Sequence, residues 1–375
     1  MKKAFILFTL VALFGTVFTG CSSSAGGSPE EGKKNDTSAE QSNKPVVKIS
    51  CNDDSAFSRK DLVLDLTFEK YDSNPTSVDV FIENNSNVYA ANCSVNSNKV
   101  TVTVPASFTG KTIGFYIKAG GVESNHISLK YGYCVTVDEL ENFINSLTTT
   151  DSVLLRVTGE YNDFQTKLNL MKNQNLKINL DLRQMEINIA DLSDCISLES
   201  VLFPDQIQSF KLKGCKNIIE INTPDSITNF DERTFYQCEK LTTRIVIPEN
   251  QTIIQRYTFY HCRKLKEVVI HDNVTEIGVS AFDGCNSLES AHLPNKLQTL
   301  GERAFSSCYK IQEINIPNGV QTINITTFSN CKSVKKVILP DSLVTIGKMA
   351  FYGSFSQENI NTIRSNCDSC QCYKN

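Results

Sequence analysis

The C-terminal half of the chain repeats one short pattern of apolar and polar positions. Seven cysteines, each followed three residues later by leucine, isoleucine or valine, mark the units, and the last three steps, from Cys262 to Cys331, are each 23 residues long. A fixed period of this length is typical of a solenoid, whose units are too small to bury their own apolar faces and therefore stack on one another. We expect this solenoid to span residues 191–363.

The unit LKEVVIHDNVTEIGVSAFDGC, which begins at Leu265, shows how a repeat is built. Its first apolar residues, including Val268 and Ile270, predict a short strand, the polar HDN segment predicts a turn, and Val274 and Ile277 return to the interior. The positions between them are polar and vary among units, as a stacked core with a solvated exterior requires. A cysteine and a phenylalanine recur at fixed positions of the repeats and are predicted to form a structural ladder in the interior of the solenoid: Cys238, Cys262, Cys285, Cys308, Cys331, Phe235, Phe259, Phe282, Phe305, Phe328 and Phe351.

Units such as LKEVVIHDNVTEIGVSAFDGC and VKKVILPDSLVTIGKMAFYGS resemble the BspA-like leucine-rich repeats of bacterial surface antigens. The resemblance covers residues 198 to about 356 and implies a curved solenoid that binds proteins, often host proteins, and that is not an enzyme. His271 breaks a column of prolines, and Ser354 replaces the cysteine of the last unit. Atypical terminal units are expected where a stack ends.

The first 44 residues indicate export and anchoring. A basic start and an apolar run at residues 4–18 predict a signal peptide over residues 1–20. Cys21, preceded by small residues, resembles the lipidated cysteine of a bacterial lipobox, and an ordinary signal peptide with a coincidental cysteine is the alternative. Residues 21–44 carry no large apolar side chain and predict a flexible tether. We therefore expect a lipid-anchored protein of the bacterial envelope, at the outer membrane or the cell surface.

Residues 45–131 alternate apolar and polar positions with a period of two, between turns rich in Asn, Asp, Ser and Gly. This pattern predicts a small immunoglobulin-like β-sandwich. The chain has no tryptophan, so the Cys-Trp-Cys core of antibody domains is absent. Cys51 and Cys93 are equally compatible with a disulfide and with unpaired thiols. We expect strands at residues 46–49, 62–68, 78–82, 100–104, 113–117 and 127–131.

Residues 132–190 fit neither the sandwich nor the repeat, and they predict an α/β cap over the first apolar face of the solenoid. A capping-box pattern begins at Thr136, and helical spacing of apolar residues follows it. Phe164, Leu168 and Met171 predict one face of a second helix, and residues 153–157 and 176–182 predict strands. The complete chain is thus expected to be mainly β with some α.

Candidate chemistry is sparse. The cysteine column could in principle hold metal or disulfides, because equivalent residues of stacked strands lie ~4.8 Å apart. Burial as a small apolar residue fits the uninterrupted column better. In the tail at 364–375, Cys367, Cys370 and Cys372 admit a zinc site, a local disulfide or free thiols, but no histidine lies near. No enzyme motif occurs. We therefore predict a protein without metal, cofactor or catalytic residues; a hydrolase assembled from the cap is the remote alternative.

The net charge of −4 shows no basic footprint for nucleic acid. We predict a monomer whose solenoid binds a surface protein of the host or of a bacterium. The expected role is adhesion to host or matrix proteins. An envelope-organising structural lipoprotein without a host ligand is the alternative. The predicted interface is the outward side of the short strands, where charge is mixed with β-branched residues: Arg244, Val246, Lys266, Glu267, Val269, Glu289, His292, Gln312, Glu313, Asn315, Lys335, Lys336 and Ile338.

Overall fold

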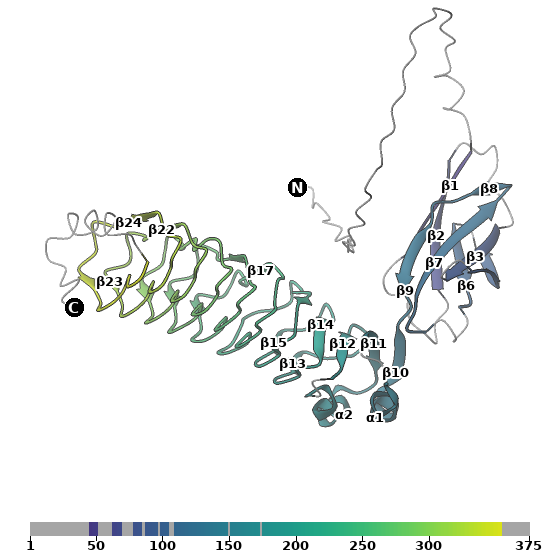
Figure 1. The fold of residues 1–375 in the computed structure, drawn as a ribbon, viewed down its shortest axis with the longest axis horizontal. Coiled ribbons are helices and arrows are strands. Elements are labelled where there is room, and N and C mark those ends of the chain that lie inside the picture. Colours follow the sequence, from purple (N-terminus) through teal and green to yellow (C-terminus); the bar gives the residue numbers. More distant parts are fainter. Residues whose placement is uncertain are drawn as a thin grey trace, which may run out of the picture. The chain divides into compact units, whose positions relative to one another are not determined.

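The computed structural model describes residues 45–51, 62–69, 78–84, 87–96, 98–104, 109–148, 151–172 and 175–354 (Figure 1). The fold is mainly β: antiparallel sheets come first, a few short helices follow, and a parallel solenoid makes up the remainder. The predicted signal peptide, Cys21, the tether and the tail cysteines lie outside the described residues.

The N-terminal strands form two antiparallel sheets that share one core. The sheet orders are β1-β2-β6-β5 and β4-β3-β7-β8, with β9 paired to β7. Alternate residues of both sheets, such as Leu64 and Val80, are buried in that core. The strands are β1 (Val46–Cys51), β2 (Leu62–Glu69), β3 (Val78–Asn84), β4 (Asn87–Ala91), β5 (Cys93–Asn96), β6 (Lys99–Val102), β7 (Thr112–Ala119), β8 (Val122–Glu123) and β9 (Ile127–Lys130).

The six strands expected from period-two alternation are confirmed as β1, β2, β3, β6, β7 and β9. The sequence does not predict β4, β5 and β8. The residues of β4 are exposed except for half-buried Ala91, so no alternation marks this edge strand. In the first sheet β2 and β6 lie between the strands that carry Cys51 and Cys93. Three strand spacings, about 14 Å, exceed the reach of a disulfide between these two cysteines.

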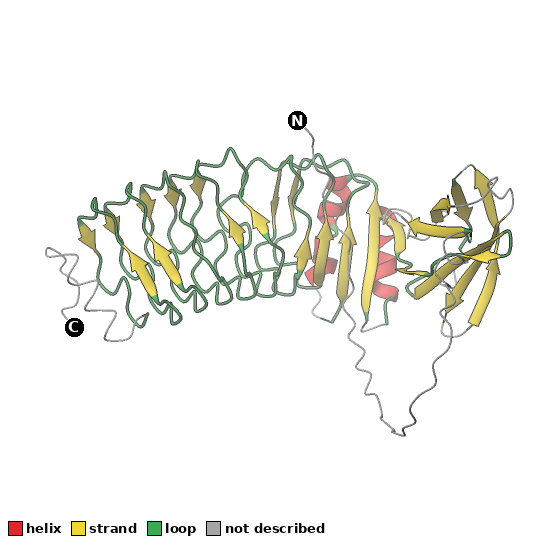
Figure 2. Cartoon of the chain, turned by 90° about the horizontal axis from the view of Figure 1, so that it is seen from above, coloured by secondary structure: helices red, strands yellow, loops and turns green. Residues whose placement is uncertain are grey.

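The segment before the repeats contains three parallel strands and one ten-residue helix: β10 (Tyr133–Thr136), α1 (Val137–Ser146), β11 (Ser152–Thr158) and β12 (Lys177–Asp181). The capping box is confirmed: the Glu139 amide donates to Thr136 Oγ1, and Glu139 Oε2 accepts from the Thr136 amide at 3.0 Å. Helix α1 buries Val137, Leu140 and Ile144. Figure 2 shows the helices beside these strands.

The prediction of a single second helix that carries Phe164, Leu168 and Met171 on one face is wrong. Helix α2 (Tyr161–Thr166) ends at Lys167, whose φ of −96° and ψ of 1° leave the helical path, and a 3₁₀ turn, η4 (Leu168–Lys172), follows. Phe164, Leu168 and Met171 are nevertheless all buried. Their spacing of four and then three residues fits two short helices as well as one, and a six-residue helix has few internal hydrogen bonds to extend it.

The solenoid has two rows of short parallel strands, visible on its two sides in Figure 2. In both rows a residue pairs with its equivalent one repeat later, as Ile245 does with Val268 and Ile254 with Ile277. The first strand row continues the sheet of β10, β11 and β12 and contains β14 (Leu198–Leu202), β16 (Glu220–Ile221), β17 (Ile245–Val246), β19 (Val268–Val269), β22 (Glu313–Asn315) and β24 (Lys336–Ile338). The second strand row contains β13 (Ile189–Asp191), β15 (Ser209–Lys211), β18 (Ile253–Ile254), β20 (Glu276–Ile277), β21 (Thr299–Leu300), β23 (Thr322–Ile323) and β25 (Thr345–Ile346).

A third side of each turn, here called the phenylalanine side, runs from the second strand row to the cysteine without a strand. Residues two before and two after the phenylalanine adopt left-handed backbone angles, such as Tyr257 with φ 59° and His261 with φ 56°. This conformation costs about 1–2 kcal/mol for a non-glycine residue. Hydrogen bonds to the next turn offset it: the Tyr257 amide donates to Val279 at 3.0 Å, and the His261 amide donates to Asp283 at 2.8 Å.

The phenylalanine column is a continuous stack in the core. Phe282 lies 5.1 Å from Phe259 and 5.0 Å from Phe305 between ring centroids, with interplanar angles of 10° and 7°. The same parallel stacking links Phe235 to Phe259 and continues through Phe328 to Phe351. One core runs from Val135 to Phe351, so the α/β segment and the repeats are buried together.

The thiols of the cysteine column donate hydrogen bonds that the repeat pattern does not predict. Each thiol donates to the backbone carbonyl of the phenylalanine position one turn earlier, as Cys285 does to Phe259 at 3.0 Å and Cys308 to Phe282 at 3.2 Å. Ser354 donates its hydroxyl to Phe328 in the same way, which explains why serine can end the column. Burial raises the pKa of these thiols, in the case of Cys331 to about 12. The thiols are therefore protonated and unreactive at neutral pH.

Candidate functional site

The structure places the predicted interface on the outward side of the first strand row. We call this set of thirteen residues, from Arg244 to Ile338, the strand face. Its charged and amide side chains are exposed, whereas Val246 and Val269 are half-buried. Five successive turns contribute to it, because β17, β19, β22 and β24 pair with neighbours in register and a bridge joins Ala291 to Ile314.

Opposite charges on neighbouring turns of the strand face pair with each other. Arg244 Nε lies 2.7 Å from Glu267 Oε1, and Lys336 Nζ lies 2.7 Å from Glu313 Oε1. Lys335 Nζ donates to the amide oxygen of Gln312 at 3.3 Å. Exposed pairs of this kind contribute about 0–1 kcal/mol each, so they are compatible with a surface that rearranges to meet a partner.

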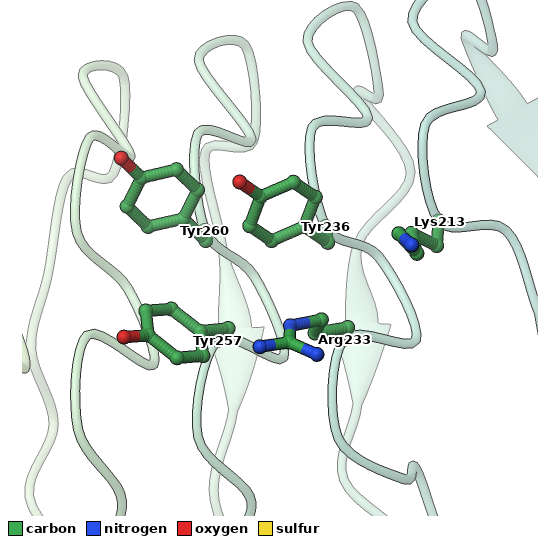
Figure 3. Close-up of a pocket in the computed structure, with 5 residues that line it drawn as sticks. All are labelled: Lys213, Arg233, Tyr236, Tyr257 and Tyr260. Carbon is green, nitrogen blue, oxygen red and sulfur yellow. The ribbon is translucent and has the colours of Figure 1, made fainter. Parts of the chain in front are cut away.

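A pocket of about 420 Å³ lies on the phenylalanine side, lined by Lys213, Arg233, Tyr236, Tyr257 and Tyr260 (Figure 3). We call it the tyrosine pocket. Three turns build it from two columns of the repeat: Lys213, Tyr236 and Tyr260 each follow the phenylalanine position, and Arg233 and Tyr257 each precede it by two residues. Phe235 and Phe259 stack beneath two of these turns, and buried Leu212 takes the equivalent position in the third.

The aromatic rings of the tyrosine pocket support one another. Tyr236 and Tyr260 stack with their centroids 4.9 Å apart and an interplanar angle of 10°. Tyr257 packs edge-on to Tyr260, with centroids 5.7 Å apart, and the Arg233 guanidinium lies 5.3 Å from the Tyr257 ring. All three tyrosines are half-buried, so part of each side chain is exposed at the pocket, and Figure 3 shows the three rings next to Arg233.

Tyr260 lies near a buried carboxylate and a stacked imidazole. Burial and the nearby Asp283 carboxylate raise the pKa of Tyr260. Asp283 is itself buried and accepts from Arg303 Nε at 3.0 Å. On the other side, His261 stacks on Tyr260 at 4.1 Å, and burial together with the charge of Arg263 lowers the pKa of His261. The imidazole beside Tyr260 is therefore neutral at pH 7.

Gly284 makes room for this arrangement. Its φ of +77° disfavours a side chain, and a Cβ at this position would lie 2.2 Å from the His261 ring. A larger residue would therefore clash with His261, the ring that stacks on Tyr260. The residues that support the tyrosine pocket from behind thus extend one turn further along the solenoid than the lining residues.

The alternation of positions in the predicted strands does not reveal the tyrosine pocket, because its five residues lie outside those strands. A usable signal exists: aligning the units on phenylalanine places Tyr236 and Tyr260 in one column, and Arg233 and Tyr257 in another. Equivalent columns of adjacent turns lie side by side in a solenoid. The tyrosines would then have been expected to meet.

Within the described residues no group of three His, Cys, Asp or Glu side chains is arranged to hold a metal ion. No helix of that part of the chain is long and apolar enough to span a bilayer. Both surfaces present exposed or half-buried side chains that can contact a ligand.

The fold and these surfaces define a leucine-rich-repeat solenoid. A family model described as BspA type leucine rich repeat region matches residues 169–285 and 252–373, together more than half of the chain. The chain therefore belongs to the BspA-type leucine-rich-repeat family, and the predicted resemblance is confirmed. No enzyme family matches the chain, and no curated protein matches it either.

Several solved structures of bacterial leucine-rich-repeat proteins are similar to part of this chain. One from T. pallidum is 20% identical, covering 52% of this chain and 86% of its own, with a TM-score of 0.35. One from Bacteroides ovatus is 22% identical over 53% of this chain, which spans only 60% of that protein, with a TM-score of 0.38. A leucine rich cell surface protein from Faecalibacterium prausnitzii is 17% identical, covering 76% of this chain and 97% of its own, with a TM-score of 0.31.

Proposed function

We propose that this chain is a lipid-anchored protein of the bacterial cell surface that binds a protein ligand through the strand face of its solenoid. The observation that carries the proposal is the strand face itself: five successive turns present exposed charged side chains among half-buried valines on one side. Mixed polar and apolar composition of this kind is usual in non-obligate protein interfaces.

The remaining parts of the chain have supporting roles in the proposal. Cys21 carries the lipid, residues 21–44 space the protein from the membrane, and residues 45–131, an immunoglobulin-like module, extend the reach of the binding surface. Residues 132–190 cover the apolar end of the repeats at 191–363. A repeat stack needs such a covered end to remain soluble.

The anchor is tested by the substitution Cys21→Ser in the full chain expressed in a bacterial host. We expect the parent protein to enter the detergent-rich phase on partitioning and the variant to enter the aqueous phase, because each buried CH₂ of an acyl chain contributes about 0.8 kcal/mol to membrane binding. Cys93→Ser is the matched control and should partition as the parent does. A Cys21→Ser variant that remains in the detergent phase would rule out the lipid anchor.

The binding role is tested with residues 45–375 against purified host matrix proteins and against an envelope fraction of the source bacterium. Charge reversal at Lys266, Lys335 and Lys336 to Glu should weaken binding of the captured protein at least tenfold. Lys336→Glu then places a like charge opposite Glu313, and any electrostatic complementarity between these three positions and the partner is reversed. The fold should persist, since exposed charges contribute little to stability.

The control for this measurement is charge reversal on the phenylalanine side, at exposed Lys213, Arg256 and Lys348. Binding should survive that triple substitution. If the control variant loses affinity and the strand-face variant keeps it, the protein ligand contacts the other side of the solenoid and the proposed interface is wrong.

A further inference from the structure

The tyrosine pocket lies outside the strand face, and the proposed protein interface makes no use of it. Three half-buried tyrosines and two cations meet there across three turns. Its volume of about 420 Å³ falls within the range of about 300–1,000 Å³ typical of small-ligand sites. A site of this size holds a single compact group rather than a protein surface.

The lining favours a ligand with a negative charge. Two cations and no carboxylate line the pocket. Glu232, next to it, is shared between two guanidiniums: its Oε1 lies 3.2 Å from Arg233 Nη1, and its Oε2 lies 2.6 Å from Arg256 Nε. The Lys213 ammonium has no carboxylate within 4 Å in the part of the chain that the structure describes. Positive charge therefore exceeds negative charge at this end of the pocket.

The backbone around the pocket is not available to a ligand. The amides of Phe235, Gln237, Tyr257 and His261 all donate to the following turn, at 2.7–3.0 Å. An extended peptide binds chiefly by adding its backbone to such donors, and here they are occupied. Recognition must instead use ring surfaces, phenol hydroxyls and cations.

We propose that the tyrosine pocket binds an acidic sugar, a pyranose that carries a carboxylate, within a glycan. The carboxylate meets Arg233 and Lys213, the sugar hydroxyls exchange hydrogen bonds with the hydroxyls of Tyr236, Tyr257 and Tyr260, and the C–H faces of the sugar lie on the aromatic rings. Each functional group of the ligand then has a matching group among the five lining residues. The proposal is independent of the strand face and of its protein ligand.

Calorimetric titration of the full chain in detergent solution tests this with trigalacturonate as the probe. We expect saturable binding that weakens as salt is added, and at least tenfold weaker binding after Arg233→Gln, Lys213→Gln or Tyr260→Ala. Tyr260→Phe keeps the ring and should lose less affinity than Tyr260→Ala. Lys332→Gln is the matched control, because Lys332 lies 4.9 Å from the Tyr309 ring outside the pocket. The affinity of the Lys332→Gln variant for trigalacturonate should equal that of the parent protein.

Two further titrations decide the class of ligand. The neutral galactose trisaccharide should bind at least tenfold more weakly than trigalacturonate, and tetraglutamate should show no saturable binding. Failure of trigalacturonate to bind, or equal binding of the neutral trisaccharide, overturns the proposal. Tetraglutamate binding as tightly as trigalacturonate also overturns it and assigns the pocket to an acidic peptide. Loss of strand-face binding to a protein would leave all of these outcomes unaffected.

Discussion

Replacing Phe282 with alanine should lower the free energy of unfolding by about 3–5 kcal/mol, because it removes a ring from the middle of a close-packed stack. Phe282 is 1% exposed and contacts Phe259 and Phe305 face to face at 5.1 and 5.0 Å. Neighbouring turns are held in register by backbone hydrogen bonds on either side, so they cannot collapse into the cavity. Chemical denaturation of the full chain, followed by far-UV circular dichroism, measures the loss.

The control for Phe282→Ala is Val279→Ala, three residues earlier on the same side. Val279 is 39% exposed, and its loss should change stability by no more than about 0.5 kcal/mol. If Phe282→Ala lowers the free energy of unfolding by less than about 1 kcal/mol, the phenylalanine column does not stabilise the stacked turns.

A second large effect is expected at a buried ion pair between β11 and β12. Arg156 and Asp181 are partners in the strand register and are both fully buried, with Arg156 Nη2 2.6 Å from Asp181 Oδ2. Arg183 also donates to this carboxylate from Nη2, at 3.0 Å. Asp181→Leu leaves the Arg156 guanidinium buried without its carboxylate and should cost about 3–5 kcal/mol.

The double variant Arg156→Met with Asp181→Leu should recover most of that loss, because a pair of apolar side chains has no charge to desolvate. Equal instability of the single and double variants would show that packing, and not the loss of the carboxylate beside Arg156, is responsible. Denaturant midpoints of the three proteins at pH 7 separate these outcomes.

The same pair predicts a dependence of stability on pH. Burial raises the pKa of Asp181, but the hydrogen bonds and charges of Arg183 and Arg156 outweigh this and the pKa is lowered. An aspartate whose pKa is lower in the folded state than the unfolded value of about 3.9 stabilises the fold above that value. This stabilisation disappears as the pH falls below about 4 and through the folded pKa. Asp181→Asn should lose stability at pH 7 and show a shallower acid transition.

Much of the architecture could be predicted from the sequence because periodicity reports which side chains are buried. The phenylalanine and cysteine columns, spaced by one turn of the solenoid, are all buried as expected. The capping box at Thr136 could also be predicted from the sequence, since its two hydrogen bonds join residues only three positions apart. Local spacing and repeat length are properties of the chain itself, and no knowledge of distant contacts is needed to recognise them.

Other features were decided only by the tertiary structure. The fully exposed part of β4 has no alternation, and the spacing of Phe164, Leu168 and Met171 fits one helix or two. Arg156 and Asp181 are 25 residues apart and meet only because β11 and β12 pair in one register. A pattern of buried positions does not state which strand will lie beside which.

The two proposed binding surfaces also differ in this respect: one could be predicted from the sequence, and the other depends on the tertiary structure. The strand face could be placed on the exterior from the sequence, because outward positions alternate with the buried ones of each short strand. The tyrosine pocket depends on three turns aligning Tyr236 with Tyr260 at 4.9 Å and on left-handed backbone angles that direct Arg233 and Tyr257 towards them. Sequence periodicity determined that these turns stack. The stacked backbone, through its hydrogen bonds from one turn to the next, decided which exposed side chains meet.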